Sequence, residues 1–481
     1  MEKVNGRKLS LIFIFILILL VIALLVGKLT FSYLGPTLGE DLSNEGEVTA
    51  SGDTLIFTKG SNLSLSATTD NFQTGGSNLS STTNPKVRLI ASSKTNSASA
   101  TYYVGVVINS NSYTYTTSDN TAEAILTIKD ENGSNVTSGV DGLTYVTSGG
   151  VSGFDVTGKT GLFNIKTDYP ISTTSSSTGT THTWTFTLTF VNLGTDQSDN
   201  ENASMDLDVY LQKEKILTLA EHVISQYTGS QGDDSLYYHN STLNNGAGDN
   251  SYRYAGASES VNNYICLGSD ATTCPDANLF RIIGVFGDQT KVIRAKSVGD
   301  QKWHTSDSNT WSSSSLNTYL NGTYLTSLGT LKNKIATTTW KVGGGSWSNI
   351  GTSVPKTAYQ YEVGSNASST TYDAKIGLMY VTDYYYSASP SAWTLVGYNG
   401  SDATKDYREA KTTNWLYLGS DEWTISRNSD TTSTAFCVNS TGFVSLDSVT
   451  ISYAVRPSFN LESSTTYVSG SGSMSDPVRI K

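Results

Sequence analysis

The stretch THTWTFTLTFVNLG, residues 181–194, decides the fold of the first half of this 481-residue chain. Apolar side chains at every second position from Trp184 to Phe190 alternate with threonines. One side of this segment is therefore apolar and the other carries hydroxyl groups. A period of two over this length is typical of a strand with one buried face.

The same alternation continues outward from this strand. It recurs in residues 205–211 and 63–67, and the apolar residues 124–128 lead into the hairpin-turn signal Asn132-Gly133. Several short strands separated by turns predict a β-sandwich, which we place at residues 49–213.

After residue 213 the apolar period changes. Ile216, Leu219, Val223 and Tyr227 fall near helical spacing, which predicts a connecting helix at residues 214–228. Residues 229–481 mix both periods and predict an α+β domain. They contain a hairpin at 279–299, a short helix after Trp311 with a serine as N-cap, and strands that include 335–341, 376–381, 435–438 and 449–455. The whole chain is thus expected to be mainly β.

Residues 9–26, LSLIFIFILILLVIALLV, carry no charge. A helix of this length is roughly 27 Å long, about the thickness of bilayer hydrocarbon. Lys3, Arg7 and Lys8 precede it, so the positive-inside rule places the C-terminal body outside the cell. We expect a cytoplasmic tip and transmembrane helix at 1–34 and a stalk linker at 35–48. The alternative is a cleaved signal peptide, although no A-x-A-like site follows.

The formal net charge is −11, and no basic stripe is present, which argues against nucleic acid as a partner. Three cysteines are too few for a disulfide framework. Cys266 and Cys274 lie in ICLGSDATTC, where Gly268 lets the segment turn, so an oxidising exterior predicts a local disulfide. Cys437 is left over and is expected to be a small core residue.

The C-terminal half resembles an uncharacterised domain family found in surface proteins of Gram-positive gut bacteria. The matching pieces, in the family's order, are LFRIIGVF…KVIRAKSV, NTWSSSSLNTYLNGTYL, KIGLMYVTDYYYSA, NWLYLGSDEWTIS and FCVNSTGFVSLDSVTISYAVRPSFNL. The last contains the family's Val-Arg-Pro signature, in which we expect Arg456 to be architectural. The family is in turn similar to the C-type-lectin-like fold, seen also in formylglycine-generating enzymes.

This second likeness concerns fold and does not by itself imply function. The sequence lacks the Glu-Pro-Asn or Gln-Pro-Asp motif of calcium-type lectins and the paired cysteines of the formylglycine enzyme. The N-terminal part, ending in HTWTFTLTFVNLGTDQSDNENASMDLDVYL, is similar to β-sandwich subunits of Gram-positive biofilm fibres.

Aromatic residues are the best functional signal, because tyrosine occurs 28 times. The segment YVTDYYYSASPSAW gathers one candidate ligand-binding set: Asp383, Tyr384, Tyr385, Tyr386 and Trp393. Exposed rings can stack on sugars or anchor peptides. The alternative is that these tyrosines belong to the core.

The loop TDQSDNEN contains Asp196, Asp199 and Glu201, whose carboxylates could bind Ca²⁺. The alternative is a solvated acidic loop.

These observations predict a membrane-anchored cell-surface adhesion protein that recognises a glycan or a surface protein without catalysis. The alternative function is a structural subunit of a surface fibre or biofilm matrix. A third interpretation is an enzyme, which would need a buried polar cluster with perturbed pKa values in a deep pocket.

Overall fold

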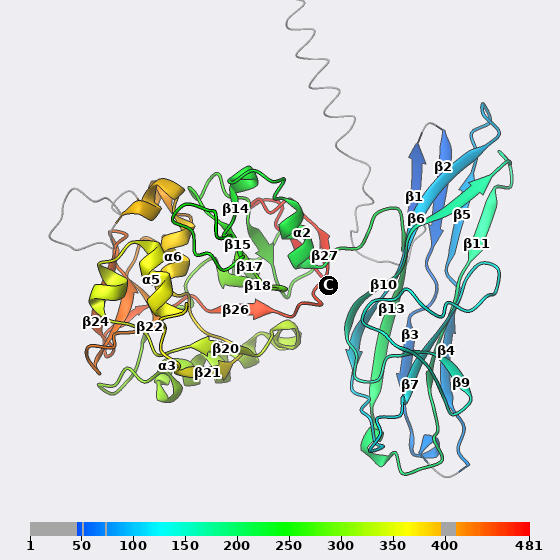
Figure 1. Ribbon diagram of the computed structural model, residues 1–481, viewed down its shortest axis with the longest axis horizontal. Coiled ribbons are helices and arrows are strands. Elements are labelled where there is room, and N and C mark those ends of the chain that lie inside the picture. The colour runs from blue at the N-terminus through cyan, green and yellow to red at the C-terminus, as the bar shows by residue number, and fades with distance from the viewer. Residues whose placement is uncertain (1–45, 51, 73–74, 396–409) are drawn as a thin grey trace, which may run out of the picture. The chain divides into compact units, whose positions relative to one another are not determined.

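A computed structural model of the chain describes residues 46–50, 52–72, 75–395 and 410–481 (Figure 1). The predicted membrane anchor at 1–34 and most of the stalk at 35–48 lie outside these residues. Within them, no helix has both the length and the apolar character needed to cross a bilayer. The described chain is mainly β and contains several sheets, as the sequence predicts.

The chain divides into two compact units. Of the described residues, the N-terminal unit comprises those up to Val106, Ser112–Thr157 and Asn164–Glu214. The C-terminal unit comprises Val107–Asn111, Gly158–Phe163 and Lys215–Lys481.

The strands up to residue 214 form three sheets, of orders β1-β2-β5-β11, β10-β6-β13-β3 and β4-β12-β7-β9-β8. Their bounds are β1 (Gly46–Ala50), β2 (Asp53–Thr58), β3 (Leu63–Ser66), β4 (Leu79–Thr83), β5 (Lys86–Ile90), β6 (Ala98–Asn111), β7 (Ala124–Lys129), β8 (Tyr145–Ser148), β9 (Val151–Asp155), β10 (Gly161–Thr173), β11 (Thr180–Thr183), β12 (Thr185–Phe190) and β13 (Ser204–Gln212).

The alternation predicted for residues 184–190 is confirmed in β12. Phe186, Leu188 and Phe190 are fully buried. On the opposite side, Thr187 and Thr189 lie 3.0 Å from the hydroxyl groups of their cross-strand neighbours in β4. Apolar burial on one face and hydroxyl pairs on the other together fix the register of this strand.

A buried carboxylate joins two loops of the N-terminal unit. Glu123 is fully buried, and its Oε1 accepts hydrogen bonds from the amide and the hydroxyl of Thr116, both at 2.6 Å. Its Oε2 accepts from Gln197 Nε2 at 2.7 Å and Asn200 Nδ2 at 2.8 Å. Hydrogen bonds to an ionised group are stronger than neutral ones, so this group holds the 114–123 segment against the 197–200 turn.

The C-terminal unit contains two larger sheets, of orders β14-β15-β17-β18-β26 (with β16 beside β17) and β19-β25-β22-β23-β24. Its strands are β14 (Leu236–Tyr238), β15 (Tyr252–Tyr254), β16 (Tyr264–Cys266), β17 (Leu279–Phe286), β18 (Gln289–Arg294), β19 (Asp300–Lys302), β20 (Thr338–Lys341), β21 (Thr371–Ala374), β22 (Glu422–Arg427), β23 (Thr434–Val438), β24 (Val444–Ser448), β25 (Ser452–Ala454), β26 (Ser458–Leu461), β27 (Tyr467–Ser469) and β28 (Arg479–Ile480).

Short helices accompany these sheets (Figure 1). They are α2 (Leu219–Ser225), α3 (Ser315–Tyr319), α4 (Leu325–Ser327), α5 (Pro355–Glu362), α6 (Val381–Ser387) and α7 (Ala410–Thr413). The predicted β17–β18 hairpin is confirmed, and Ser314 caps α3 through a hydrogen bond from Asn317 N. The strand predicted at 376–381 is wrong, because residues 376–380 form only an isolated bridge from Gly377 to Ser458 and α6 begins at Val381. The helix predicted at 214–228 is shorter, since a capping box at Thr218 starts α2 only there.

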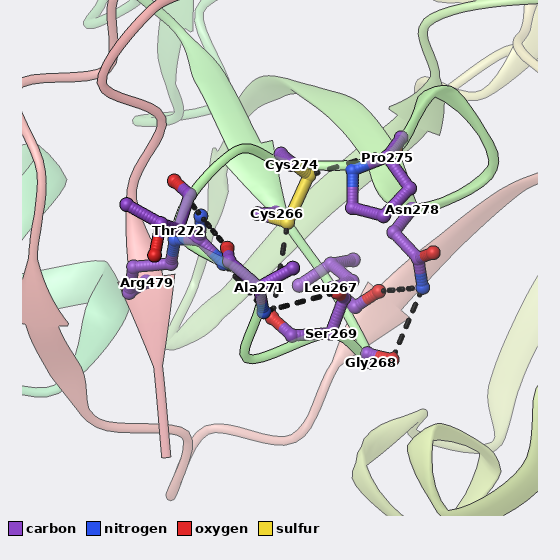
Figure 2. Close-up of a disulfide and its surroundings, with 10 residues drawn as sticks. All are labelled: Cys266, Leu267, Gly268, Ser269, Ala271, Thr272, Cys274, Pro275, Asn278 and Arg479. Atoms are coloured by element: carbon purple, nitrogen blue, oxygen red, sulfur yellow. Dashed lines mark hydrogen bonds between the residues drawn. A yellow bond between two sulfur atoms is a disulfide. The ribbon is translucent and has the colours of Figure 1, made fainter. Parts of the chain in front are cut away.

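The predicted disulfide between Cys266 and Cys274 is confirmed. Figure 2 shows that the loop it closes is also held by Arg479 of β28. The Arg479 guanidinium donates to the carbonyl oxygens of Ser269 and Ala271, both at 2.8 Å, and of Thr272 at 3.2 Å. The loop therefore links β16 to the last strand of the chain.

Loss of Glu123 as an acceptor should weaken the N-terminal unit. In Glu123→Gln an amide NH2 group replaces one carboxylate oxygen and faces other donors. We therefore expect the free energy of unfolding to fall by about 2–4 kcal/mol. Hydrogen exchange of the β12 amides in the full chain measures this. Glu201→Gln, the same change at an exposed position of the 197–201 segment, should leave exchange unchanged. Equal exchange in both variants would contradict the role given to Glu123.

Loss of the disulfide should weaken the C-terminal unit. We expect the free energy of unfolding of a Cys266→Ser/Cys274→Ser variant to be lower by about 2–3 kcal/mol, because the disulfide that closes this short loop restricts the unfolded chain. Seven of the eight tryptophans lie in this unit, so denaturant unfolding followed by tryptophan fluorescence reports on it. Dithiothreitol should shift the wild-type curve and leave that of the variant in place. An unshifted wild-type curve would contradict the expectation.

Candidate functional site

The predicted aromatic site lies in the core of the C-terminal unit. All seven residues of α6 are buried, and the helix packs against α5, β15, β22 and β23. The exposed fraction is 0% for Tyr384 and Tyr385 and 1% for Tyr386 and Trp393. The expectation that these rings are exposed to a ligand is therefore wrong, because α6 is covered on every side.

The polar tips of these rings have partners inside the protein. The hydroxyl groups of Tyr384 and Tyr385 donate to backbone carbonyl oxygens at 2.7 Å and 3.0 Å, on Gly442 and Ile350. The indole of Trp393 donates to Ala388 O at 3.0 Å. Buried aromatic residues with satisfied polar atoms are typical of a core.

Asp383 is buried with an exposed fraction of 2% and lies between two cations. Its Oδ2 is 2.5 Å from Lys291 Nζ of β18, and its Oδ1 is 3.7 Å from Arg253 Nη1 of β15. Arg253 also pairs with Asp249, whose Oδ2 lies 2.6 Å from Nη2. We call these four residues the Asp383 network. Two positive and two negative charges balance within it.

Aromatic rings surround the cations of the Asp383 network. The Arg253 guanidinium lies 4.6 Å from the ring centre of Phe286 and 5.1 Å from that of Tyr386. Lys291 Nζ lies 4.4 Å from the ring centre of Tyr380. Such an environment strengthens every charge interaction and makes an unpaired charge costly.

The pKa directions reflect a competition between burial and pairing. Burial lowers the pKa of Lys291, although the Asp383 carboxylate opposes the shift. Burial would raise the pKa of Asp249, but the Arg253 charge and hydrogen bonds from Ser251 outweigh it and hold that pKa below its usual range. The charged side chains of the Asp383 network therefore pair with one another.

Two further buried carboxylates serve the backbone and a second ion pair. Glu362 accepts from Val381 N and Thr382 N, both at 2.8 Å, and burial raises its pKa. Glu422 receives two hydrogen bonds of 2.7 Å from Arg456, which confirms the expectation that Arg456 is architectural. Cys437 is also buried, as predicted, and burial raises the pKa of its thiol.

The predicted calcium ligands do not converge. Asp196 Oδ1 accepts from Ser198 N at 3.0 Å, and the neighbouring Asn200 side chain turns inward to Glu123. Asp199 and Glu201 lie in and just after the short turn that follows. In the part of the chain that the structure describes, no group of three or more His, Cys, Asp or Glu residues could hold a metal ion.

A group of half-exposed tyrosines lies elsewhere, which the sequence reasoning missed. Tyr227 follows α2, Tyr238 ends β14 and Tyr252 begins β15. We call them the tyrosine triad. The rings of Tyr238 and Tyr252 stack with their centres 4.5 Å apart, and the Tyr227 ring lies 5.9 Å and 5.6 Å from them. The only sequence signal was tyrosine in two short strands, and their pairing could not be read from it.

A shallow hollow of about 550 Å³ lies on the same unit, between residues 258–264 and 473–475. Met474 on its rim is 60% exposed. Neither the Asp383 network nor the tyrosine triad lines this hollow.

Comparison with known proteins adds one finding. Residues 287–463 are similar to a family described as a domain of unknown function, DUF6273. The matched stretch includes Lys291, Asp383 and Arg456, and it begins after the tyrosine triad. No curated protein matches the chain.

Removal of the central charge should destabilise the C-terminal unit. Asp383→Asn leaves Lys291 and Arg253 buried with too little negative charge, so we expect a loss of about 3–5 kcal/mol in denaturant unfolding followed by tryptophan fluorescence. Asp276→Asn makes the same change in the exposed pair with Lys296 and should leave the midpoint unchanged. Equal effects would show that Asp383 is not the centre of the cluster.

Proposed function

We propose that this protein is a membrane-anchored recognition protein of the cell surface, whose C-terminal unit binds a glycan or another surface protein without catalysis. The N-terminal apolar helix would be the anchor, a β-sandwich the spacer, and a C-type-lectin-like domain the binding head. The proposal rests above all on the use of ionisable groups in the C-terminal unit. Asp383 and Glu422 are held in buried ion pairs, whereas a group of aromatic rings lies partly exposed at the surface.

Three carboxylates and the free thiol of this unit, which are residue types that enzymes use, are buried. A catalytic acid, base or nucleophile has to reach a substrate, usually in a pocket. Asp383, Glu362 and Glu422 are 2% exposed or less and are held by internal partners. The Cys437 thiol is buried with a raised pKa, which is the opposite of an activated nucleophile.

The disulfide supports an extracellular location, because disulfides persist in oxidising surroundings. The apolar run at 9–26 with cations before it supports the same orientation. An acidic chain with few clustered cations suits a soluble surface domain better than a nucleic-acid partner.

The second candidate is a structural subunit of a surface fibre or matrix. The observation that favours it is the β-rich N-terminal unit with its likeness to biofilm-fibre subunits. Ordered filaments formed by the purified full chain in detergent, without any added ligand, would support this function instead of recognition.

Binding should be detectable when the full chain in detergent micelles is applied to a glycan array and to a panel of host and bacterial surface proteins. We expect at least one reproducible partner and no turnover of it. Trypsin added to intact cells should remove the C-terminal unit, as judged by an antibody against it. Silence on both panels, or full protection from trypsin in cells that stay intact, would contradict the proposal.

A further inference from the structure

The tyrosine triad is a surface feature built from three separate segments. Tyr227, Tyr238 and Tyr252 are each partly exposed, whereas Tyr254, two residues further along β15, is buried with an exposed fraction of 1%. In the pairing of β14 with β15, Tyr238 lies directly opposite Tyr252. Such a pair places two rings side by side on one face of the sheet, and the chain after α2 brings the third.

The backbone around the triad is held in place by side-chain amides. Gln231 donates from Nε2 to Tyr238 O at 2.9 Å and accepts from Tyr238 N at 2.9 Å. Asn250 Oδ1 accepts from the Tyr238 hydroxyl at 3.3 Å. Asn250 has a φ of +59°, in the left-handed region that asparagine tolerates best after glycine. These hydrogen bonds fix the backbone that carries the rings.

The tyrosine hydroxyl groups and the polar groups beside them can still form hydrogen bonds with a ligand. The Tyr227 hydroxyl donates to Gly229 O at 3.3 Å, a long hydrogen bond. Among the described residues, none forms a hydrogen bond with the Tyr252 hydroxyl. Asp233 and Asp234 lie in the turn before β14, and Thr228 donates to the Asp233 carboxylate. The nearest buried cation, Arg253, is already paired with Asp249 and Asp383.

We propose that the tyrosine triad binds an uncharged saccharide; this rests on the proposed recognition function and names its ligand class. A pyranose ring has C–H groups on its faces and hydroxyl groups at its edge. Phenol rings offer apolar contact to the faces, and their hydroxyls and nearby amides and carboxylates match the edge. An anionic sugar or a nucleic acid fits less well, because acidic residues flank the triad and its nearest buried cation is neutralised.

The test uses the full chain in detergent and affinity gel electrophoresis in four soluble neutral polysaccharides: dextran, mannan, galactomannan and hydroxyethylcellulose. Alginate serves as the anionic comparison. We expect at least one neutral polysaccharide to retard the protein and alginate not to. Tyr238→Thr and Tyr252→Thr keep strand propensity but remove the ring, and each should weaken binding about fivefold to tenfold.

Two kinds of control separate the ring from general damage. Tyr252→Phe keeps the ring and should keep most of the affinity. Met474→Ala removes an exposed side chain at the separate hollow, and Tyr417→Thr removes a half-exposed tyrosine elsewhere in the unit; both should bind as the wild type does. A tryptophan-fluorescence melting curve for each variant confirms that it folds, and Tyr238→Leu or Tyr252→Leu, which also removes the ring, replaces a threonine variant that does not.

The outcomes separate this inference from the proposed function. Binding of neutral polysaccharide that survives both threonine variants overturns the triad as the site but keeps recognition. A second outcome is that no neutral polysaccharide binds, whereas a surface protein does and the threonine variants abolish that binding. This result overturns the saccharide as ligand and points to a protein partner at the same rings. The absence of any binding to polysaccharides, glycans or proteins overturns both.

Discussion

The C-terminal unit depends on one constraint: the carboxylate of Asp383 has to sit between two cations that are themselves buried. Lys291 comes from β18, Arg253 from β15 and Asp383 from α6, so the network joins two strands of one sheet to the helix beside them. A shift of α6 by one residue would separate these charges in an apolar surrounding, at a cost of several kcal/mol. The ion pairs therefore determine the position of the helix more strictly than the rings around it do, because apolar contacts tolerate small displacements.

This constraint explains why the run of tyrosines lies inside. Each tyrosine hydroxyl in α6 donates to a carbonyl oxygen on a distant part of the chain, such as Gly442 or Ile350. With that partner, a phenol can be buried without an unsatisfied polar atom. The residues that supply these carbonyls are far away in the sequence. Local pattern alone gives no sign of them, and a tyrosine-rich segment then resembles an exposed binding surface.

Local signals were sufficient for other parts of the protein. The alternation in β12, the hairpin between β17 and β18, the short disulfide loop and the architectural role of Arg456 depend on residues close in sequence or on a single strong pairing. The helix α6 and the loop at 196–201 could not be predicted in the same way. In α6 a long-range bond uses Asp383, which the sequence suggested was free for a ligand, and in the loop the Asn200 side chain turns inward to Glu123. The tyrosine triad was missed for a related reason, since the register of β14 with β15 decides which rings meet.

The side chain of Gln231 has a consequence for assembly. β14 is the outer strand of its sheet, and such a strand normally offers unpaired amides and carbonyls to any extended peptide. Here the Gln231 side-chain amide forms hydrogen bonds with both backbone groups of Tyr238, as a neighbouring strand would. Two residues earlier in β14, Leu236 O accepts from Gly232 N at 2.9 Å. An incoming chain would have to displace these bonds before it could continue the ladder. This border of the sheet is thus protected against polymerisation by strand addition.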